Sequence, residues 1–197
     1  MVRYDDNKMS SSHAIRITVV GDGDTGKTCM LIVYKDKKFD NRYVPTVFDV
    51  YSMNIPINGV EYKVILSDTA GQEDFDKLRR LAYKDVDVFI VTYAVNERTS
   101  YENVFLKWAP ELKKFAPKAK IIVAGTKQDL RTNSRAHVSH EEGEALAKDV
   151  NAHGFIENSS KNMSFIDETF QMAISVVVYN QNFLKAKRRS HNLCICL

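Results

Sequence analysis

Residues 21–28 combine the groups that hold a phosphate. They read Gly-Asp-Gly-Asp-Thr-Gly-Lys-Thr and fit the pattern G-x-x-x-x-G-K-[S/T]. The glycines let backbone N–H groups turn inward around phosphate oxygens, and a helix that begins near Gly26 adds the positive end of its dipole. Lys27 places a charge on the β- and γ-phosphates, and the Thr28 hydroxyl ligates Mg²⁺. The alternative is a turn that binds nothing, but the apolar run before it and the helical pattern after it disfavour that reading.

A second segment, residues 68–73, follows another apolar run. A carboxylate at the end of that strand faces the phosphate loop, so Asp68 is expected to be the second anchor for Mg²⁺, through water. An aspartate in such a place is usually a helix cap, and only the phosphate loop upstream favours the metal role. Gly71 has no side chain, so its N–H can approach a γ-phosphate closely, and Gln72 can orient an attacking water.

A third group of residues could select the base. In the segment Thr-Lys-Gln-Asp at 126–129, the Asp129 carboxylate can accept hydrogen bonds from guanine N1–H and its exocyclic amine. Adenine offers no such donor pair, and a buried carboxylate left without partners costs about 1–3 kcal/mol or more. The stem of Lys127 could cover the base and ribose. The segment 159–161, Ser-Ser-Lys, could supply the backbone N–H of Ser160 to guanine O6. Each motif is weak alone, but they occur in a consistent series.

The elements that position these segments alternate between strand-like runs and helical patterns, which indicates an α/β fold. The pair Asn58-Gly59 predicts a hairpin, and Pro56 places the strand before it at a sheet edge. We therefore expect a six-stranded, mostly parallel sheet with one antiparallel edge strand and about five flanking helices, with the ligand at the carboxyl ends of the strands. The apolar runs read as buried strands are 15–20, 64–66, 86–94 and 121–124.

Two segments carry apolar residues at helical spacing. The first is expected to begin with Ser100 as its N-cap and to kink at Pro110. Both apolar stripes, which include the single tryptophan, are predicted to be core and not cofactor contacts. The stripes consist of Tyr101, Val104, Phe105, Trp108, Leu112 and Phe115, and of Ile166, Phe170, Ala173, Ile174 and Val177.

A chain of 197 residues with no internal repeat indicates one domain. We expect it at residues 13–184, after a flexible extension at 1–12 and before a basic tail at 185–197. Three cysteines make no disulfide framework and favour a reducing compartment, and no run has the 18 or so apolar residues of a membrane span. The tail cations Lys185, Lys187, Arg188 and Arg189 exceed the whole net charge of +3. A body this close to neutral argues against nucleic-acid binding, and the basic tail argues for an acidic surface.

Taken in order, these segments resemble the Ras-like small GTPases over residues 15–187. The segment Tyr-Val-Pro-Thr-Val-Phe-Asp at 43–49 is similar to the first switch of the Rho/Rac branch. So are the Thr-Lys-x-Asp form, Trp-Ala-Pro-Glu at 108–111 and Asp-Phe-Asp-Lys-Leu-Arg at 74–79. The resemblance implies a P-loop NTPase fold of the Ras-like G-domain type that binds GTP or GDP with Mg²⁺.

The resemblance also adds residues to the site. It implies that Thr46 completes the Mg²⁺ shell and binds γ-phosphate through its N–H, that Phe39 packs edge-on against guanine and that Tyr43 covers the phosphates. Two switch segments, 39–50 and 69–83, would be ordered by the γ-phosphate and released by its loss. The expected nucleotide-binding set is Gly21, Gly23, Asp24, Thr25, Gly26, Lys27, Thr28, Cys29, Phe39, Tyr43, Thr46, Gly71, Thr126, Lys127, Asp129, Ser159, Ser160 and Lys161. The expected metal set is Thr28, Thr46 and Asp68, and the expected catalytic set is Gln72, Lys27 and Thr46.

The sequence departs from the Rho pattern in two places. The helical insert that normally follows the guanine motif is absent after Leu130, a pattern similar to insert-lacking protist Rho proteins such as that of Entamoeba. Asp24 and Thr25 stand where small apolar residues are usual. A carboxylate in an anion-binding loop should repel phosphate, so one hypothesis is that Asp24 weakens nucleotide binding and speeds GDP release. The equally weighted alternative is that Asp24 points into solvent or pairs with a lysine, with little effect.

The last four residues, Cys-Ile-Cys-Leu, match a C-a-a-X prenylation signal, and the final leucine indicates a geranylgeranyl group on Cys194. One lipid chain holds a membrane only marginally, so the tail cations would be the second signal. This predicts a protein at the cytoplasmic face of the plasma membrane that cycles with the cytosol.

The expected mechanism is slow hydrolysis that a partner accelerates. We find no segment that would supply a catalytic arginine in cis, and arginine fingers contribute roughly 10³–10⁵ in rate, as in Ras itself. The resemblance implies exchange factors, GTPase-activating proteins, a dissociation inhibitor and cytoskeletal effectors such as formins or kinases, acting on a monomer. One alternative is a nucleotide-loaded membrane scaffold that rarely hydrolyses, against which Gly23, Thr46 and Gln72 argue. Another is a P-loop ATPase or kinase, against which Asp129 and Ser160 argue.

Overall fold

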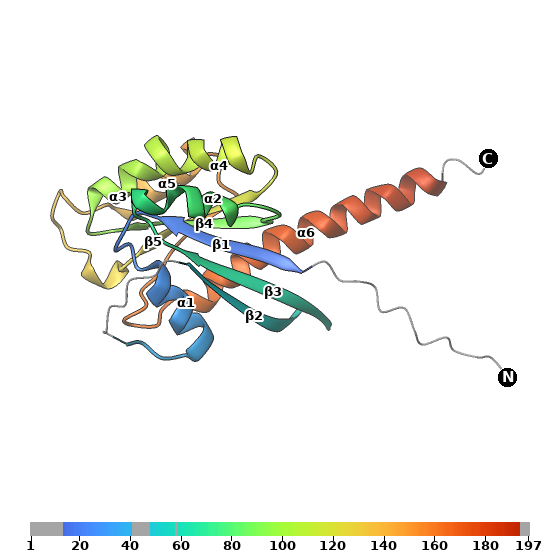
Figure 1. Ribbon diagram of the computed structural model, residues 1–197, viewed down its shortest axis with the longest axis horizontal. Helices are drawn as coiled ribbons and strands as arrows, with labels where there is room; N and C mark the ends of the chain where they lie inside the picture. Colours follow the sequence, from blue (N-terminus) through green and yellow to red (C-terminus); the bar gives the residue numbers. More distant parts are fainter. Residues whose placement is uncertain (1–13, 41–47, 58, 194–197) are drawn as a thin grey trace.

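The computed structural model describes residues 14–40, 48–57 and 59–193. Within them, six strands form one sheet in the order β2-β3-β1-β4-β5-β6, and only the β2–β3 pair is antiparallel (Figure 1). The predicted six-stranded, mostly parallel sheet with an antiparallel edge strand is therefore confirmed. The strands are β1 (Ile15–Gly21), β2 (Phe48–Ile57), β3 (Val60–Thr69), β4 (Val88–Ala94), β5 (Lys120–Thr126) and β6 (Gly154–Glu157).

Helices cover both faces of the sheet, and each face has its own apolar core (Figure 1). One face packs against α1 (Lys27–Asp36) and α6 (Ile166–Leu193). The opposite face packs against the continuous run α3 (Arg98–Asn103), η2 (Val104–Trp108) and α4 (Ala109–Phe115), and against α5 (His140–Asp149). The short helix α2 (Asp76–Leu81) lies beside this run, with Arg79 over the Trp108 ring. Strands buried on both faces are apolar along nearly their whole length, as β4 is. The expected five helical units are present if α3, η2 and α4 are taken as one.

The strand register brings the predicted site segments to one edge of the sheet. Val19 of β1 lies beside Asp68 of β3, and Gly21 lies beside Thr92 of β4. At the same edge, β5 ends at Thr126. Because these parallel strands all end there, the loops that follow them meet, as expected for ligand sites in open α/β sheets.

The β2–β3 hairpin also follows the sequence pattern. Ile57 pairs with Val60, so two residues make the connection, and Gly59 has a φ of 78° that favours glycine. Asn58 lies outside the described residues. Pro56 lies on β2, at the sheet edge, as predicted.

The helical run after β4 differs from the prediction at its start. It begins at Arg98, and its N-cap is Glu97, whose side chain accepts a hydrogen bond from the Thr99 N–H. The expected N-cap, Ser100, lies inside the helix and is buried. Its hydroxyl donates to the Glu97 carbonyl at 2.7 Å and accepts from the Ala94 N–H at 3.0 Å, so the hydroxyl joins the helix to the end of β4.

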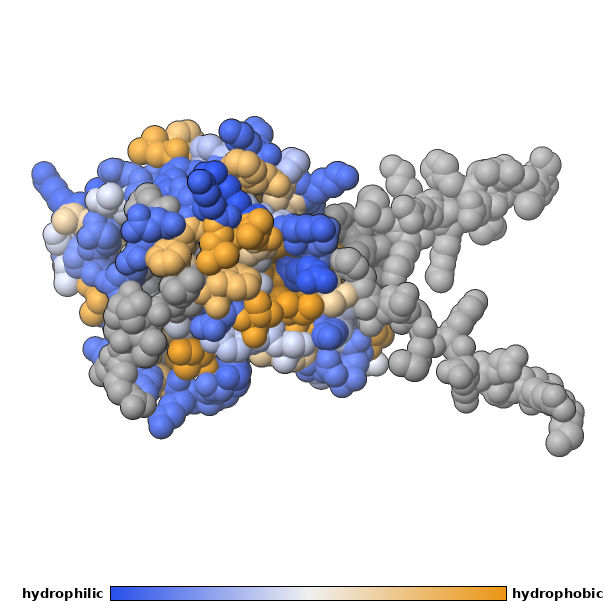
Figure 2. Space-filling view, in the orientation of Figure 1, coloured by the Kyte–Doolittle hydropathy of each residue, from blue (hydrophilic) through white to orange (hydrophobic). Residues whose placement is uncertain are grey.

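A π-helical turn, η2, lies just before the predicted kink at Pro110. This wider turn leaves Val104, Trp108 and Leu112 on the buried face, at intervals of four residues. Phe105 and Phe115 were predicted to be core, but they are 53% and 44% exposed. Figure 2 shows hydrophobic residues reaching the surface over this helix, at the top of the view.

The last described element is the long helix α6. The apolar face of α6 packs on the core through Ile166, Phe170 and Ala173, as predicted. The helix continues to Leu193, so it includes residues that the sequence analysis assigned to the basic tail. Residues 1–13 and 194–197, which include the predicted extension and Cys194, lie outside the described residues. Among the described helices, none has the length and apolar character needed to cross a bilayer.

Candidate functional site

The loop between β1 and α1 is built on two glycines with positive φ. Gly21 has φ 143°, and a Cβ there would lie 2.4 Å from the Thr92 carbonyl oxygen. Gly26 has φ 82° and is the N-cap of α1. Side chains at either position would strain or block the turn, so the loop needs glycine at both. Gly23 has more space, and its nearest neighbour is the Gln72 side chain, 4.0 Å from a Cβ built there.

Lys27 begins α1 and is buried, with its ammonium folded back over the loop. Its Nζ donates to the carbonyl oxygens of Gly21 at 2.9 Å and Asp22 at 2.5 Å. Burial lowers the pKa of Lys27 to about 8, although the nearby carboxylates of Asp68 and Asp22 act in the opposite direction. The ammonium is therefore placed at the centre of the loop, at the mouth of the nest that would receive phosphate oxygens.

Thr28 and Asp68 meet although forty residues separate them in sequence. The Thr28 hydroxyl donates to Asp68 Oδ2 at 2.6 Å. Hydroxyl and carboxylate oxygens are hard ligands of the kind Mg²⁺ prefers, and Mg²⁺ usually takes its remaining ligands from phosphate and water. The described residues contain no group of three or more histidine, cysteine or acidic side chains that could hold a metal ion by themselves. The donor set fits Mg²⁺. Thr46, the other predicted ligand, lies outside the described residues, as does Tyr43.

The base-recognition corner forms where η3 (Gln128–Leu130) meets the loop after β6. The Ser159 hydroxyl donates to Asp129 Oδ1 at 2.5 Å, and the Asp129 side chain is only 10% exposed. Lys161 Nζ lies 4.0 Å from the other carboxylate oxygen. Ser160 follows directly in the same turn. The structure thus brings these four predicted residues together.

Two threonines join the base corner to the phosphate loop. The Thr126 hydroxyl donates to the carbonyl oxygens of Thr25 at 2.6 Å and Tyr93 at 2.9 Å. The Thr25 hydroxyl contacts the Thr92 hydroxyl at 2.7 Å and donates to the Asp22 carbonyl at 3.0 Å. A buried hydroxyl at Thr25 therefore has partners, which explains how this position tolerates a polar residue. Thr92 was not expected in the site, because a threonine within an apolar strand carries no sequence signal of its own.

Asp24, the second departure, pairs with a lysine. It has a positive φ of 57°, and its carboxylate Oδ2 lies 3.1 Å from Lys127 Nζ. This is the geometry of the alternative hypothesis, in which Asp24 pairs with a lysine. Two further predicted nucleotide contacts are Cys29, which lies on α1, and Phe39, which lies just after it. Cys29 is half-buried, which raises the pKa of its thiol, and Phe39 packs partly buried against the core under α1.

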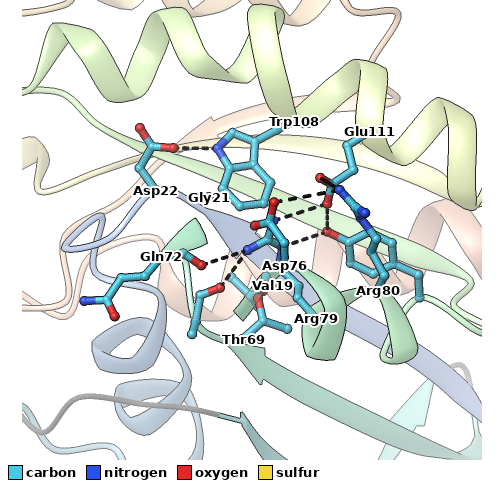
Figure 3. A network of polar contacts seen from close by, with 12 residues as sticks. Val19, Gly21, Asp22, Thr69, Gln72, Asp76, Arg79, Arg80, Trp108 and Glu111 are labelled. Carbon is cyan, nitrogen blue, oxygen red and sulfur yellow. Dashed lines mark hydrogen bonds and ion pairs between the residues drawn. The ribbon is translucent and has the colours of Figure 1, made fainter. Parts of the chain in front are cut away.

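The segment that carries Gln72 lies directly on the phosphate loop. A Cβ on Gly71 would be 2.4 Å from the Gly21 carbonyl oxygen and 2.4 Å from the Asp22 carbonyl carbon. Only glycine allows this approach. Figure 3 shows the Gln72 side chain extending away from Arg79 and its partners.

A polar network behind this segment includes residues that the sequence analysis did not place in the site. Asp22 accepts a hydrogen bond from the indole N–H of Trp108 at 2.8 Å (Figure 3) and another from the Asn103 amide at 2.6 Å. Trp108 is core, as predicted, but it also tethers the phosphate loop. Arg79 lies over its ring, 4.5 Å from the centroid. An aspartate within the loop motif is the one sequence signal that pointed to such a tether.

A short connection occupies the place of the missing insert. Residues 131–139 join η3 to α5 through turns and bends, without a helix in that stretch. Arg131 forms a bidentate contact with Glu157, with Nη1 2.8 Å from Oε2, and its Nε donates to the Val138 carbonyl at 2.9 Å. Since Arg131 directly follows η3, this ion pair fastens the base corner to the end of β6. Ser139 then starts α5 with a capping box to Glu142.

Comparison with known proteins agrees with this geometry. The chain matches the family model of the Ras family over residues 16–179. It is 41% identical over 172 residues to the Ras-like GTP-binding protein RhoL of Drosophila melanogaster, an alignment that covers 87% of this chain and 90% of that protein. The matched region contains the phosphate loop, the Gln72 segment and the base corner.

Proposed function

Since the chain belongs to the Ras family of small GTP-binding proteins, we propose that it acts as a membrane-anchored molecular switch of the Rho branch. Proteins of this family are GTPases that bind GTP and GDP with Mg²⁺. One observation carries the nucleotide-binding part of this proposal: three sets of paired groups converge at one edge of the sheet. They are Lys27 with the loop carbonyls, Thr28 with Asp68, and Asp129 with Ser159.

Each pair has a separate task in nucleotide binding. Lys27 and the loop N–H groups hold the β- and γ-phosphates, and the buried position of the ammonium strengthens its attraction for them. Thr28 would supply its hydroxyl oxygen to Mg²⁺, and Asp68 Oδ2, which lies 2.6 Å from that oxygen, orients the hydroxyl. Mg²⁺, when bound, neutralises charge that develops on the phosphates. Asp129 accepts from the guanine edge, with Ser159 fixing the carboxylate in place.

Hydrolysis would then depend on Gln72. Its side chain lies beside Gly23 and faces away from the network around Arg79, where it can orient a water for in-line attack (Figure 3). The described arginines next to the Gln72 segment are committed to other contacts, since Arg79 is buried and Arg80 lies near Glu111. We therefore propose slow intrinsic hydrolysis and an activating protein that supplies an arginine, a contribution of roughly 10³–10⁵ in rate.

Sequence features support the Rho branch. The segments at 43–49, 74–79 and 108–111 have the Rho-type form, and RhoL is a relative at 41% identity. The missing insert sets the chain apart from the usual Rho pattern, as in the insert-lacking protist proteins it resembles. The Rho branch implies four classes of partner: exchange factors, activating proteins, a dissociation inhibitor and cytoskeletal effectors of the formin or kinase type. Through these effectors the protein would signal to actin.

The membrane anchor is part of the same proposal. Cys194 would carry a geranylgeranyl group, and the cations at 185–189 would bind anionic lipid. Together they would hold the protein at the cytoplasmic face of the plasma membrane, from which a dissociation inhibitor returns it to the cytosol. Neither signal is sufficient alone, because a single lipid chain gives only marginal, reversible binding.

A second candidate is a nucleotide-loaded scaffold that rarely hydrolyses or cycles. The Asp24–Lys127 pair is the feature that favours it, because it joins a carboxylate of the phosphate loop to the lysine expected to cover the base. A single-turnover GTP assay separates the two candidates. A switch converts all bound GTP to GDP and does so faster with an activating protein, whereas a scaffold retains GTP.

The central experiment identifies the nucleotide that the purified protein carries. Mass spectrometry of the denatured, full-length protein should detect GDP or GTP in near-equimolar amount. Protein that emerges empty and takes up neither nucleotide in magnesium buffer would refute the proposal. Displacement of bound GDP by ATP would instead favour an ATPase or kinase. A pull-down from the source cell, with each nucleotide loaded in turn, then separates effectors from regulators.

A further inference from the structure

Arg79 of α2 is a buried cation that contacts the backbone on both sides of Gly71. Its side chain is 1% exposed. Its Nη1 donates to the Ala70 carbonyl at 3.2 Å and to the Gln72 carbonyl at 3.4 Å (Figure 3). One nitrogen of the guanidinium therefore donates to two carbonyl oxygens that are two residues apart in sequence.

These contacts determine how the neighbouring peptide groups face. In a trans peptide, the C=O of one residue and the N–H of the next point in opposite directions. Because the Ala70 carbonyl faces Arg79, the Gly71 N–H faces away from it. At Gln72 the carbonyl likewise faces Arg79, and the side chain extends away from the guanidinium (Figure 3). Gly71 itself lies against the Gly21 carbonyl, which limits the ways in which this segment can rearrange.

The guanidinium is in turn held in one orientation by groups on two helices. Asp76 accepts from Nη2 at 2.6 Å, and the Tyr83 hydroxyl lies 3.1 Å from Nε. Glu111 of α4 lies 3.4 Å from Nη2 and accepts from the Tyr83 hydroxyl at 2.7 Å. Underneath, the Trp108 ring lies 4.5 Å from the guanidinium carbon. Hydrogen bonds thus hold the edges of the guanidinium, and the Trp108 ring covers one of its faces.

We propose that Arg79 is a positioning residue for GTP hydrolysis, which turns the Gly71 N–H and the Gln72 side chain toward the phosphate loop by holding the carbonyls on either side of Gly71. The proposal rests on the GTPase function proposed above. Arg79 does not touch the nucleotide. It acts through Gly71, which would meet the γ-phosphate, and through Gln72, which would orient water. The same guanidinium lies on the Trp108 ring, whose indole N–H tethers Asp22, so the phosphate loop and the Gln72 segment share one support.

Replacing Arg79 with lysine tests this with the positive charge kept. Lysine cannot reproduce a planar fork that contacts two carbonyls, a carboxylate and a tyrosine hydroxyl at once. The matched control is Arg80→Lys, because Arg80 is the next residue on the same helix and contacts Glu111 without contacting Ala70 or Gln72. The full-length chain is loaded with GTP, and single-turnover hydrolysis is followed. Affinities for GDP and for a non-hydrolysable GTP analogue are measured separately.

We expect Arg79→Lys to slow hydrolysis by about tenfold or more, since misplacing a catalytic group by about 1 Å costs up to ~10²-fold. The preference for the GTP analogue over GDP should fall, because Gly71 contacts only the γ-phosphate, while GDP affinity stays close to that of the wild type. In a Gln72→Leu background, Arg79→Lys should slow hydrolysis less than it does in the wild type, because the part of its effect that acts through Gln72 is already lost. Arg80→Lys should behave as the wild type.

Three results would overturn the proposal: unchanged hydrolysis, equal slowing with and without Gln72, or parallel loss of GDP and GTP-analogue binding, which would indicate a merely structural role. If Arg79→Lys does not fold, Asp76→Ala releases the guanidinium from one side and should give a smaller change in the same direction. Failure of the proposed function is distinguishable, because the wild-type protein would then neither hydrolyse GTP nor prefer the analogue.

Discussion

Lys127 Nζ lies 3.1 Å from Asp24 Oδ2, so the lysine that follows β5 is paired with a carboxylate of the phosphate loop. Asp24 is 84% exposed at its side chain and Lys127 is 25% exposed, and an ion pair in such a place contributes about 0–1 kcal/mol to stability. The pair therefore matters for nucleotide binding more than for the stability of the fold. The ion pair engages the ammonium group of Lys127, whose stem is expected to cover the base and ribose. It also places the negative charge of Asp24 near the phosphates.

The first prediction concerns Asp24→Ala. Removing the carboxylate frees Lys127 and reduces repulsion of the phosphates, so we expect GDP release to slow by about fivefold, the equivalent of about 1 kcal/mol between charges at 4 Å in water. Release of a fluorescent GDP measures this, with Asp24→Asn as the control that keeps the side-chain shape. The difference should shrink at high salt, because exposed charges are screened. An unchanged rate would mean that the ion pair neutralises Asp24 without consequence, and faster release would mean that the pair helps to retain the nucleotide.

The second prediction concerns Asp129→Ala. The carboxylate is largely buried and fixed by Ser159, so its loss leaves the guanine N–H donors unpaired. We expect GDP affinity to fall by about 10²-fold or more while ADP affinity stays low, since sites that hydrogen-bond a ligand group discriminate by up to ~10⁴–10⁵. Competition binding with both nucleotides measures the ratio. Gln128→Ala, on the same turn, is the control. Retention of full preference for GDP would assign base recognition to other residues.

Much of the site was predictable because its parts are local. Gly21 and Gly26 are needed by a loop of fixed length between a strand and a helix, and Asp68 is placed by the end of its own strand. Strand order was not given by any motif, but the parallel pattern requires all carboxyl ends to meet at one edge. The pairs Thr28–Asp68 and Asp129–Ser159 followed from that edge.

The errors arose where a contact depends on tertiary structure. Phe105 and Phe115 match a regular helical stripe, but the π-helical turn at η2 shifts the inward face, so both are exposed. Ser100 has the composition of an N-cap, yet the helix starts one turn earlier because Glu97 caps it. Arg79 could not be assigned from sequence either, because an arginine on a polar helix is normally exposed, and its burial depends on a tryptophan distant in the chain.

The third prediction uses pH. Glu157 is buried at the end of β6, and burial alone would raise its pKa, but hydrogen bonds from Arg131 and His140 outweigh this and lower the pKa below the ordinary value. A lowered pKa in the folded state means that the stabilisation is complete above the unfolded-state pKa, near 4.5, and is lost as pH falls through the folded-state value. The base corner should therefore lose stability in acid.

Glu157→Gln should remove this contribution. Compared with the wild type, the variant should be less stable at pH 7, by about 1–3 kcal/mol, and its stability should decline less between pH 5 and pH 3. Urea unfolding at fixed GDP and Mg²⁺ measures both effects. Glu168→Gln, at an exposed position on α6, is the control and should keep the wild-type acid response. An equal acid response in Glu157→Gln and the wild type would show that Arg131 does not depend on this carboxylate.

The last prediction concerns the two-part membrane anchor. The tail cations Lys185, Lys187, Arg188 and Arg189 each add about 1 kcal/mol of attraction to an anionic surface, so together they raise binding by about 10³-fold over the lipid alone. Raising the salt concentration from about 0.1 M to about 1 M shortens the screening length from about 10 Å to about 3 Å and should detach the geranylgeranylated protein from anionic vesicles. Vesicles of neutral lipid are the control, since binding to them should be weak and insensitive to salt. Replacement of the four cations by glutamine should reproduce the neutral-vesicle result on anionic vesicles at low salt. Binding to anionic vesicles that survives both high salt and this replacement would mean that the lipid on Cys194 is sufficient, and the basic residues of the tail would then need another acidic partner.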